Sequence, residues 1–201
     1  MRESSQKSER PILLLTNNSN TNPLYDWLLE EEPCVLRVEG VIGDELFARH
    51  PRFAVSFNYR HIISAEKIEA LGCPIVNVHC SVLPWNRGAA PNFFSYYEGT
   101  PKGVTVHQLT AGLDKGGVIL QSILPLDENE TFESSYAKLI DCGIDLIKNN
   151  WVDLVNGRLD ITPQSSGGSY HTVLDFEAIR SKYPFSWSER ICDWKDRNGL
   201  E

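Results

Sequence analysis

The chain has 201 residues, of which 41% are hydrophobic and 23% charged, and its formal net charge is −8 at pH 7. A chain of this length buries enough apolar surface to form a globular domain without disulfide bonds or bound metals. The negative charge argues against a surface that holds nucleic acid by neutralising its phosphates, so we expect no nucleic-acid partner.

Cysteine content and hydropathy indicate where in the cell we expect the protein to be. The five cysteines are an odd number, are scattered, and show no metal-ligand spacing, which predicts reduced thiols and no metal site. The apolar run at residues 12–15 is too short for a signal sequence or a membrane span. We therefore expect a cytoplasmic protein with no membrane partner.

The amino-terminal half alternates short apolar runs with helical patterns. Residues 1–10 are polar and are expected to form a flexible leader. The unbroken apolar run that follows is typical of a strand covered on both faces. Strands are predicted at 11–16, 34–38 and 53–57, and helices at 22–32, 43–50 and 64–71. This alternation predicts an α/β fold in three layers, a Rossmann-like, mostly parallel sheet flanked by helices.

The second half continues with three strands and a long helix. Strands are predicted at 75–79, 103–109 and 118–123. Apolar residues recur at helical spacing over 131–156, where Gly157 ends the helix, and a shorter helix is expected at 175–182. We expect one domain over 11–160, with a carboxy-terminal extension over 161–201 packed on it.

Two polar side chains interrupt the apolar strand at 75–79. Asn77 and His79 are two residues apart and therefore project from the same face, where buried polar groups are seldom placed for packing alone. A loop opens directly after them, where open α/β sheets form their sites. If the two following strands pair as neighbours, their glycine-flanked loop brings the Asp114 carboxylate within reach of His79.

These residues carry a family resemblance. The run Asn77-Val78-His79, the following Ser81-Val82-Leu83-Pro84, Arg87-Gly88, the strand at 103–107, and Leu113-Asp114 followed by Gly116 resemble the folate-dependent formyltransferase family. The resemblance implies transfer of a formyl group from 10-formyltetrahydrofolate to an amine, by an N-formyltransferase that uses no metal. It departs from the family at Cys80, where proline or a small residue is common.

By resemblance, three residues are catalytic. His79, as imidazolium, and Asn77 would donate hydrogen bonds to the formyl oxygen as it becomes negative. Asp114 would favour the protonated imidazole and take the proton of the amine. His107, also on a strand, is interpreted as structural.

The resemblance also implies where the folate lies. The loop that receives the pterin ring corresponds to Phe57, Tyr59, Arg60 and Ile62, and Gly112 with Leu113 would contribute to the same site. The family has a longer segment before this loop. One strand–helix unit is therefore missing or abbreviated here, which gives a shortened amino-terminal half.

Three residues that follow the predicted strand at 75–79 are candidates for substrate binding. Ser81 is assigned to a turn or to a substrate hydrogen bond, because no base is positioned to activate it. Arg87 would hold a phosphate or carboxylate with its fork of donors, or brace the loop. Trp85 would pack against a base or sugar of the substrate, or would belong to an aromatic core with residues 93–97.

Branches of the family differ in their acceptor. Methionyl-tRNA formyltransferase needs a basic face and a further domain, and glycinamide ribonucleotide formyltransferase needs a glycine-rich turn where residues 16–20 have none. The resemblance is closest to small sugar N-formyltransferases, which act on a nucleotide-linked amino-deoxysugar for surface polysaccharide synthesis. A formyltetrahydrofolate hydrolase, a glycinamide ribonucleotide enzyme and a non-catalytic folate-binding domain stay open, as does a homodimer.

Overall fold

The computed structural model describes residues 9–200, so the expected leader over residues 1–10 lies almost entirely outside the described residues. Six strands form one sheet in the order β2-β1-β3-β4-β6-β7, and β5 and β8 form a separate pair. The chain folds into two compact units. The first comprises Asn77 and the described residues before it, with Leu109–Ala111; the second comprises Val78–Gln108 and the residues from Gly112 onward.

The first unit repeats the strand–helix alternation that the sequence predicts. Strand β1 lies parallel to both β2 and β3, with Leu13 paired to Leu36 on one side and to Ala54 on the other. Helix α3 ends at Gly72, whose φ of 59° is the left-handed cap that ends many helices. Its elements are β1 (Ile12–Leu15), α1 (Asn22–Glu31), β2 (Val35–Val38), α2 (Asp44–Phe47), β3 (Phe53–Phe57), α3 (Ala65–Leu71) and the start of β4 (Ile75–His79).

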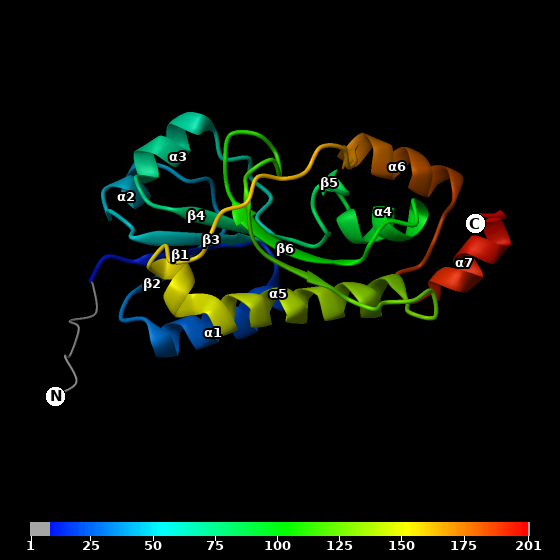
Figure 1. The fold of residues 1–201 in the computed structure, drawn as a ribbon, viewed down its shortest axis with the longest axis horizontal. Coiled ribbons are helices and arrows are strands. Elements are labelled where there is room, and N and C mark those ends of the chain that lie inside the picture. Colours follow the sequence, from blue (N-terminus) through cyan, green and yellow to red (C-terminus); the bar gives the residue numbers. More distant parts are fainter. Residues whose placement is uncertain (1–8, 201) are drawn as a thin grey trace. The chain divides into compact units, whose positions relative to one another are not determined.

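Helices cover both faces of these strands. All four residues of β1 are buried, as expected for a strand without alternation. Leu13 and Leu15 pack with residues of α3 and the neighbouring strands in one apolar cluster. Helix α1, which buries Leu24 and Leu28, lies on the opposite face from α2 and α3 (Figure 1). The expected three-layer α/β arrangement with a mostly parallel sheet is therefore confirmed.

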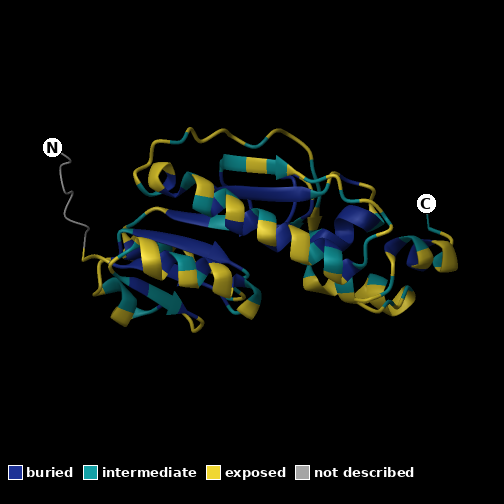
Figure 2. Cartoon of the chain, turned by 90° about the horizontal axis from the view of Figure 1, so that it is seen from below, coloured by how far each residue is buried: buried dark blue, intermediate teal, exposed yellow. Residues whose placement is uncertain are grey.

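The second unit is built on an antiparallel pair and a long helix. Strand β6 pairs antiparallel with β7, and α5 packs against β6. Helix α5 begins with a reciprocal capping box between Thr131 and Ser134 and ends just before Gly157, close to the predicted limits. Its buried and exposed residues alternate along its length (Figure 2). The unit contains the end of β4, then β5 (Arg87–Gly88), α4 (Pro91–Tyr97), β6 (Gly103–Gln108), β7 (Val118–Ile123), α5 (Phe132–Val155), β8 (Tyr170–His171), α6 (Val173–Lys182) and α7 (Ile191–Asn198).

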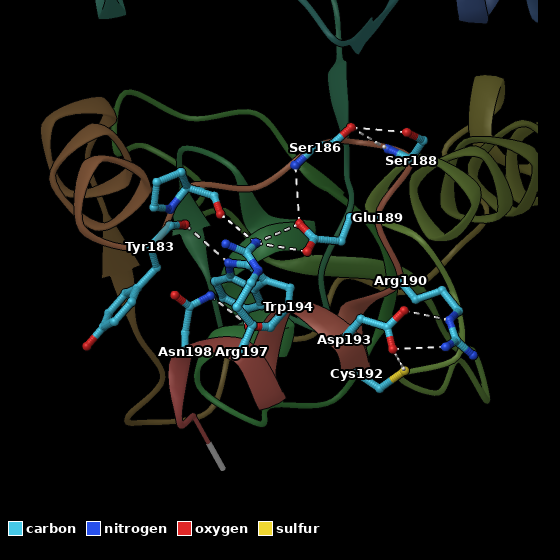
Figure 3. Close-up of polar contacts among 11 residues, drawn as sticks. Tyr183, Ser186, Ser188, Glu189, Arg190, Cys192, Asp193, Trp194, Arg197 and Asn198 are labelled. Carbon is cyan, nitrogen blue, oxygen red and sulfur yellow. Dashed lines mark hydrogen bonds and ion pairs between the residues drawn. The ribbon is translucent and has the colours of Figure 1, made fainter.

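An aromatic cluster joins α4 to the carboxy-terminal helices. Phe93, Phe132 and Trp194 are buried and contact one another, with Phe93 and Trp194 ring centres 5.4 Å apart. The Trp194 indole donates a hydrogen bond to the Tyr183 carbonyl, and Arg197 pairs with Glu189 (Figure 3). Helices α4 and α7 and the β5–β8 pair were not predicted. The expected boundary between a domain over 11–160 and an extension over 161–201 stays a prediction.

Candidate active site

His79 and Asp114 meet within the second unit. His79 is the last residue of β4, and Asp114 lies in the loop between β6 and β7. The Nδ1 atom of His79 lies 3.6 Å from Oδ2 of Asp114. Both residues are nearly inaccessible, with 7% and 9% of their surfaces exposed. The predicted approach of these two side chains is confirmed, whereas their catalytic roles remain predictions.

The conformation of the loop that carries Asp114 is set by its backbone geometry and by hydrogen bonds to its backbone carbonyls. Asp114 has a φ of 50°, a left-handed conformation that non-glycine residues adopt at a cost. At Gly116 an added Cβ atom would overlap the Gln108 carbonyl oxygen, so only glycine fits there. The Gln164 amide donates hydrogen bonds of 2.7 and 2.8 Å to the carbonyls of Asp114 and Gly116. Together these contacts hold the carboxylate in place.

Three groups surround the Asp114 carboxylate and keep it ionised. The Gly88 N–H donates to Oδ2 at 2.8 Å, and His107 Nε2 lies 3.4 Å from Oδ1. Burial is the largest influence and raises the pKa of Asp114, but His79, His107 and the Gly88 N–H together outweigh it and lower that pKa to about 2. His107 therefore faces the site, and its interpretation as a purely structural residue was incomplete.

The His79 ring is held from its other side by a backbone carbonyl. His79 Nε2 lies 2.8 Å from the Asn86 carbonyl oxygen, an acceptor that requires Nε2 to carry a proton. Burial lowers the pKa of His79 more than Asp114 and Asn86 raise it. The lowered pKa favours a neutral ring, and the contact with Asn86 places its proton on Nε2, so Nδ1 faces Asp114; the expected imidazolium stays a prediction.

Asn86 is a site residue that the sequence did not reveal. It is fully buried and has a φ of 56°. Its backbone N–H and its side-chain oxygen both bond the Ser169 hydroxyl, at 3.0 Å each, and its side-chain nitrogen donates to Thr100 at 2.7 Å. Asparagine is enriched at such left-handed positions, but one asparagine in a loop carries too little signal to predict this network.

The residues expected to contact folate fall into both units. In the first unit, Phe57 is buried at the end of β3, and the Tyr59 hydroxyl donates to the Gly40 carbonyl. The Arg60 N–H donates to the Asn17 side chain at 2.9 Å, and Ile62 is 84% exposed. These contacts order the loop, and its pterin-binding role stays a prediction.

In the second unit, Leu113 exposes 47% of its surface, and Gly112 accepts a turn hydrogen bond from the Lys115 N–H at 3.2 Å. Ser81 is fully buried, and its hydroxyl donates to the Trp85 carbonyl at 2.7 Å, so it braces the turn instead of reaching a substrate. Trp85 itself is 40% exposed. Asn77 is half-buried, two residues before His79 on the same strand.

An open groove of about 500 Å³ in the second unit contains Arg87. One guanidinium nitrogen of Arg87 donates to the Gly167 carbonyl at 2.9 Å, while its Nε atom has no partner among the described residues. Lys115, next to Asp114, adds a second cation. The groove is lined by Arg87, Gln108, Lys115, Gly117, Ile161, Pro163, Gln164 and Ser165.

The sequence pattern that defines the formyl transferase family matches residues 36–149, more than half of the chain. The protein belongs to this family, and the resemblance seen in the sequence is confirmed. It has the formyltransferase fold. Among its described residues no helix is long and apolar enough to cross a membrane.

Two kinds of relative are similar to this chain. The formyltransferase PseJ from Anoxybacillus kamchatkensis, solved with UDP-4,6-dideoxy-4-formamido-L-AltNAc and tetrahydrofolate, is 32% identical with a TM-score of 0.81, over 92% of this chain and 97% of that one. A dTDP-4-amino-4,6-dideoxyglucose formyltransferase from Mycobacterium bovis is 30% identical over 63% of this chain and 53% of its own length. Methionyl-tRNA formyltransferase from Bacillus mycoides is 28% identical over 75% of this chain and 45% of its own length. The chain spans about half the length of these curated relatives.

Proposed function

We propose that the protein transfers a formyl group from 10-formyltetrahydrofolate to the amino group of a nucleotide-linked amino-deoxysugar. The observation that carries the proposal is the buried pair of His79 and Asp114, 3.6 Å apart, in a chain of the formyl transferase family. The similarity to a formyltransferase solved with a UDP-linked sugar and tetrahydrofolate supports both the donor and the acceptor class.

The proton of the attacking amine goes to His79 in this proposal. A carboxylate whose pKa is about 2 is a weak base on its own, so Asp114 is a poor final acceptor of that proton. Neutral His79 offers the lone pair of Nδ1, and the adjacent carboxylate stabilises the imidazolium that forms. This arrangement revises the expected roles: His79 is the base, and Asp114 is its electrostatic partner.

The folate donor would supply the carbonyl carbon that the amine attacks; the bond from that carbon to the folate nitrogen then breaks, and His79 returns the proton to this nitrogen as tetrahydrofolate leaves. The chain offers exposed apolar side chains at two positions where folate was expected, Leu113 and Ile62. Asn77 remains the proposed donor to the formyl oxygen, since neither ring nitrogen of His79 is left to donate to it.

Two cations in the groove support an acceptor that carries phosphates. Arg87 and Lys115 both line the groove, so two positive side chains lie beside any anion bound there. The negative net charge of the whole chain makes such a local positive site more selective for a small anion than for tRNA.

The test is an acceptor panel with purified protein. 10-Formyltetrahydrofolate is mixed with UDP- and dTDP-linked 4-amino-dideoxysugars, glycinamide ribonucleotide, methionyl-tRNA, or no amine. We expect tetrahydrofolate release together with a sugar product heavier by one formyl group. Asp114→Asn is the matched inactive control, with a loss of about 1000-fold in kcat.

Other results would redirect the assignment. Tetrahydrofolate release without any amine would make the protein a hydrolase in which water replaces the sugar. Formylation of glycinamide ribonucleotide alone would move it to the purine branch. Folate binding measured by calorimetry, with no turnover of any acceptor, would support a non-catalytic derivative.

A further inference from the structure

The short strand β5 connects the two halves of the candidate site. The carbonyl of Asn86, just before β5, accepts a hydrogen bond from His79 Nε2 at 2.8 Å. The N–H of Gly88, at its end, donates to Asp114 at 2.8 Å. The position of this three-residue segment therefore sets both the orientation of the imidazole and the hydrogen bonding of the carboxylate.

Residues far along the chain hold this segment in place. The Arg87 N–H donates to the Ser169 carbonyl at 3.1 Å, and the Ala89 N–H donates to the His171 carbonyl at 2.9 Å. The His171 ring stacks on Phe94 with ring centres 3.6 Å apart, which anchors the end of β8. The segment from Ser169 to His171 is thus a rigid support for β5.

Among the hydrogen bonds of the described residues, Ser169 is the only residue of this segment whose side chain bonds to Asn86. Its hydroxyl accepts from the Asn86 N–H and donates to the Asn86 side-chain oxygen, both at 3.0 Å. Asn86 is held in the left-handed region, which costs of the order of 1 kcal/mol and persists only where its surroundings enforce it. The Ser169 hydroxyl is the group placed to enforce it.

We propose that Ser169 is a positioning residue for the formyl transfer. It holds Asn86 so that the carbonyl of that residue accepts a hydrogen bond from the Nε2–H of His79, which leaves Nδ1 facing Asp114. The proposal rests on the proposed function for its activity readout, but its structural content, the tautomer of His79, is measured without turnover. A backbone carbonyl that fixes a histidine tautomer is a recognised way to set which nitrogen acts as the base.

The experiment combines NMR with kinetics. Long-range ¹H–¹⁵N spectra of histidine-labelled protein identify the His79 tautomer, with assignment by His79→Gln among the five histidines. We expect the Nε2–H form in the unsubstituted protein and a mixture of tautomers in Ser169→Ala. The same variant should lose about 10- to 100-fold in kcat with KM unchanged. Asp114 and His107 face the ring in both proteins, so the titration of all three groups is followed together.

Matched variants separate positioning from general damage. Ser169→Thr keeps the hydroxyl and should keep the tautomer, and Ser166→Ala, at an exposed serine three residues before Ser169, should change nothing. Ser169→Cys, which preserves the shape but weakens the hydrogen bonds, replaces the alanine variant if that variant does not fold.

The outcomes are distinct. An Nδ1–H ring in the unsubstituted protein, or a single unchanged tautomer in both Ser169→Ala and Ser169→Cys, overturns the proposal. A tautomer that shifts in a protein without formyl transfer to any acceptor supports the positioning role and refutes the proposed function instead.

Discussion

His107 and Asp114 face each other across the turn between β6 and β7, with Nε2 of the histidine 3.4 Å from Oδ1 of the carboxylate. The other ring nitrogen of His107 lies 2.9 Å from the Gln108 carbonyl oxygen, which fixes the ring and directs Nε2 at Asp114. His79 approaches the same carboxylate from β4. The Asp114 carboxylate thus faces two histidines, and of these only His79 also contacts the Asn86 carbonyl.

Substitution of His107 tests whether this second histidine controls the carboxylate. In His107→Gln we expect the pKa of Asp114 to rise from about 2 toward its ordinary value of 3.8, because a hydrogen bond that favours the ionised form is weakened. A ¹³C titration of the carboxyl carbon measures this change. His61→Gln, at a loop histidine of the first unit, is the control. An unchanged carboxyl pKa in His107→Gln would contradict the assignment.

The two perturbed pKa values predict how stability depends on pH. The pKa of Asp114 is lower in the folded state, so its contribution of about 2 kcal/mol is complete above its ordinary pKa of 3.8 and is lost as pH falls toward 2. The pKa of His79 is also lowered, by burial, so folding favours the neutral ring. Stability therefore begins to fall as pH drops below 6.5, the ordinary value for histidine.

Urea unfolding as a function of pH measures both effects. We expect His79→Gln to lose the pH dependence that begins near 6.5, and Asp114→Asn to lose the part between 3.8 and 2. Each group shifts the pKa of the other, so both pH profiles are compared with that of the unsubstituted protein. Identical pH profiles for His79→Gln and the unsubstituted protein would show that the pKa of His79 is not lowered.

Gly88 is predicted to be irreplaceable because of where it lies in β5. Its φ is 88°, and an added Cβ atom there would overlap the His171 carbonyl oxygen. Gly88→Ala should separate β5 from β8 and remove the N–H from Asp114, with a loss of about 100-fold or more in kcat. Gly99→Ala is a matched control, because Gly99 has a φ of 65° but no atom within 4 Å of the added Cβ. Equal activity in the two variants would refute the role of the β5–β8 contact.

The sequence predicted most of the first unit because its signals are local. The helical period and the left-handed Gly72 determine α3, whose limits at Ser64 and Gly72 were read directly from the residue types, although the Ser64 side chain makes no cap hydrogen bond. The approach of His79 and Asp114 was predicted only on the condition that the strands flanking the Asp114 loop pair as neighbours, as β6 and β7 do.

The rest depends on contacts between distant residues. Asn86 and Ser169 are 83 positions apart, and neither belongs to a periodic pattern. Helix α4 has only seven residues, with a proline near its start and four aromatic residues. It is therefore too short to show a helical period, and its helix propensity is low. The direction in which the pKa of His79 is shifted could not be predicted, because burial, which the sequence does not report, decides it.

The aromatic cluster predicts how the last helix contributes to stability. Trp194 is fully buried against Phe93 and Phe132. Trp194→Ala should therefore lower the free energy of unfolding by about 3–5 kcal/mol, the usual cost of removing a buried aromatic side chain. Trp187→Ala, at a tryptophan with 45% of its surface exposed, is the control and should cost less than about 1.5 kcal/mol. Chemical denaturation gives both values, and equal losses would contradict the packing of α7.

Arg87 either braces its loop or binds a phosphate of the acceptor, and substitutions of this residue distinguish the two roles. Its guanidinium donates to the Gly167 carbonyl, and the residue also lines the groove that contains Lys115. If Arg87 holds a phosphate of the acceptor, Arg87→Gln should raise KM for the nucleotide-linked sugar about 10-fold with kcat nearly unchanged. Arg87→Lys should recover only part of this loss, because it keeps the charge but not the fork of donors. Lys115→Gln serves as the comparison, since it removes a cation of the same groove that makes no brace to Gly167. A lower thermal midpoint in Arg87→Gln with KM unaltered in both glutamine variants would make Arg87 a brace alone.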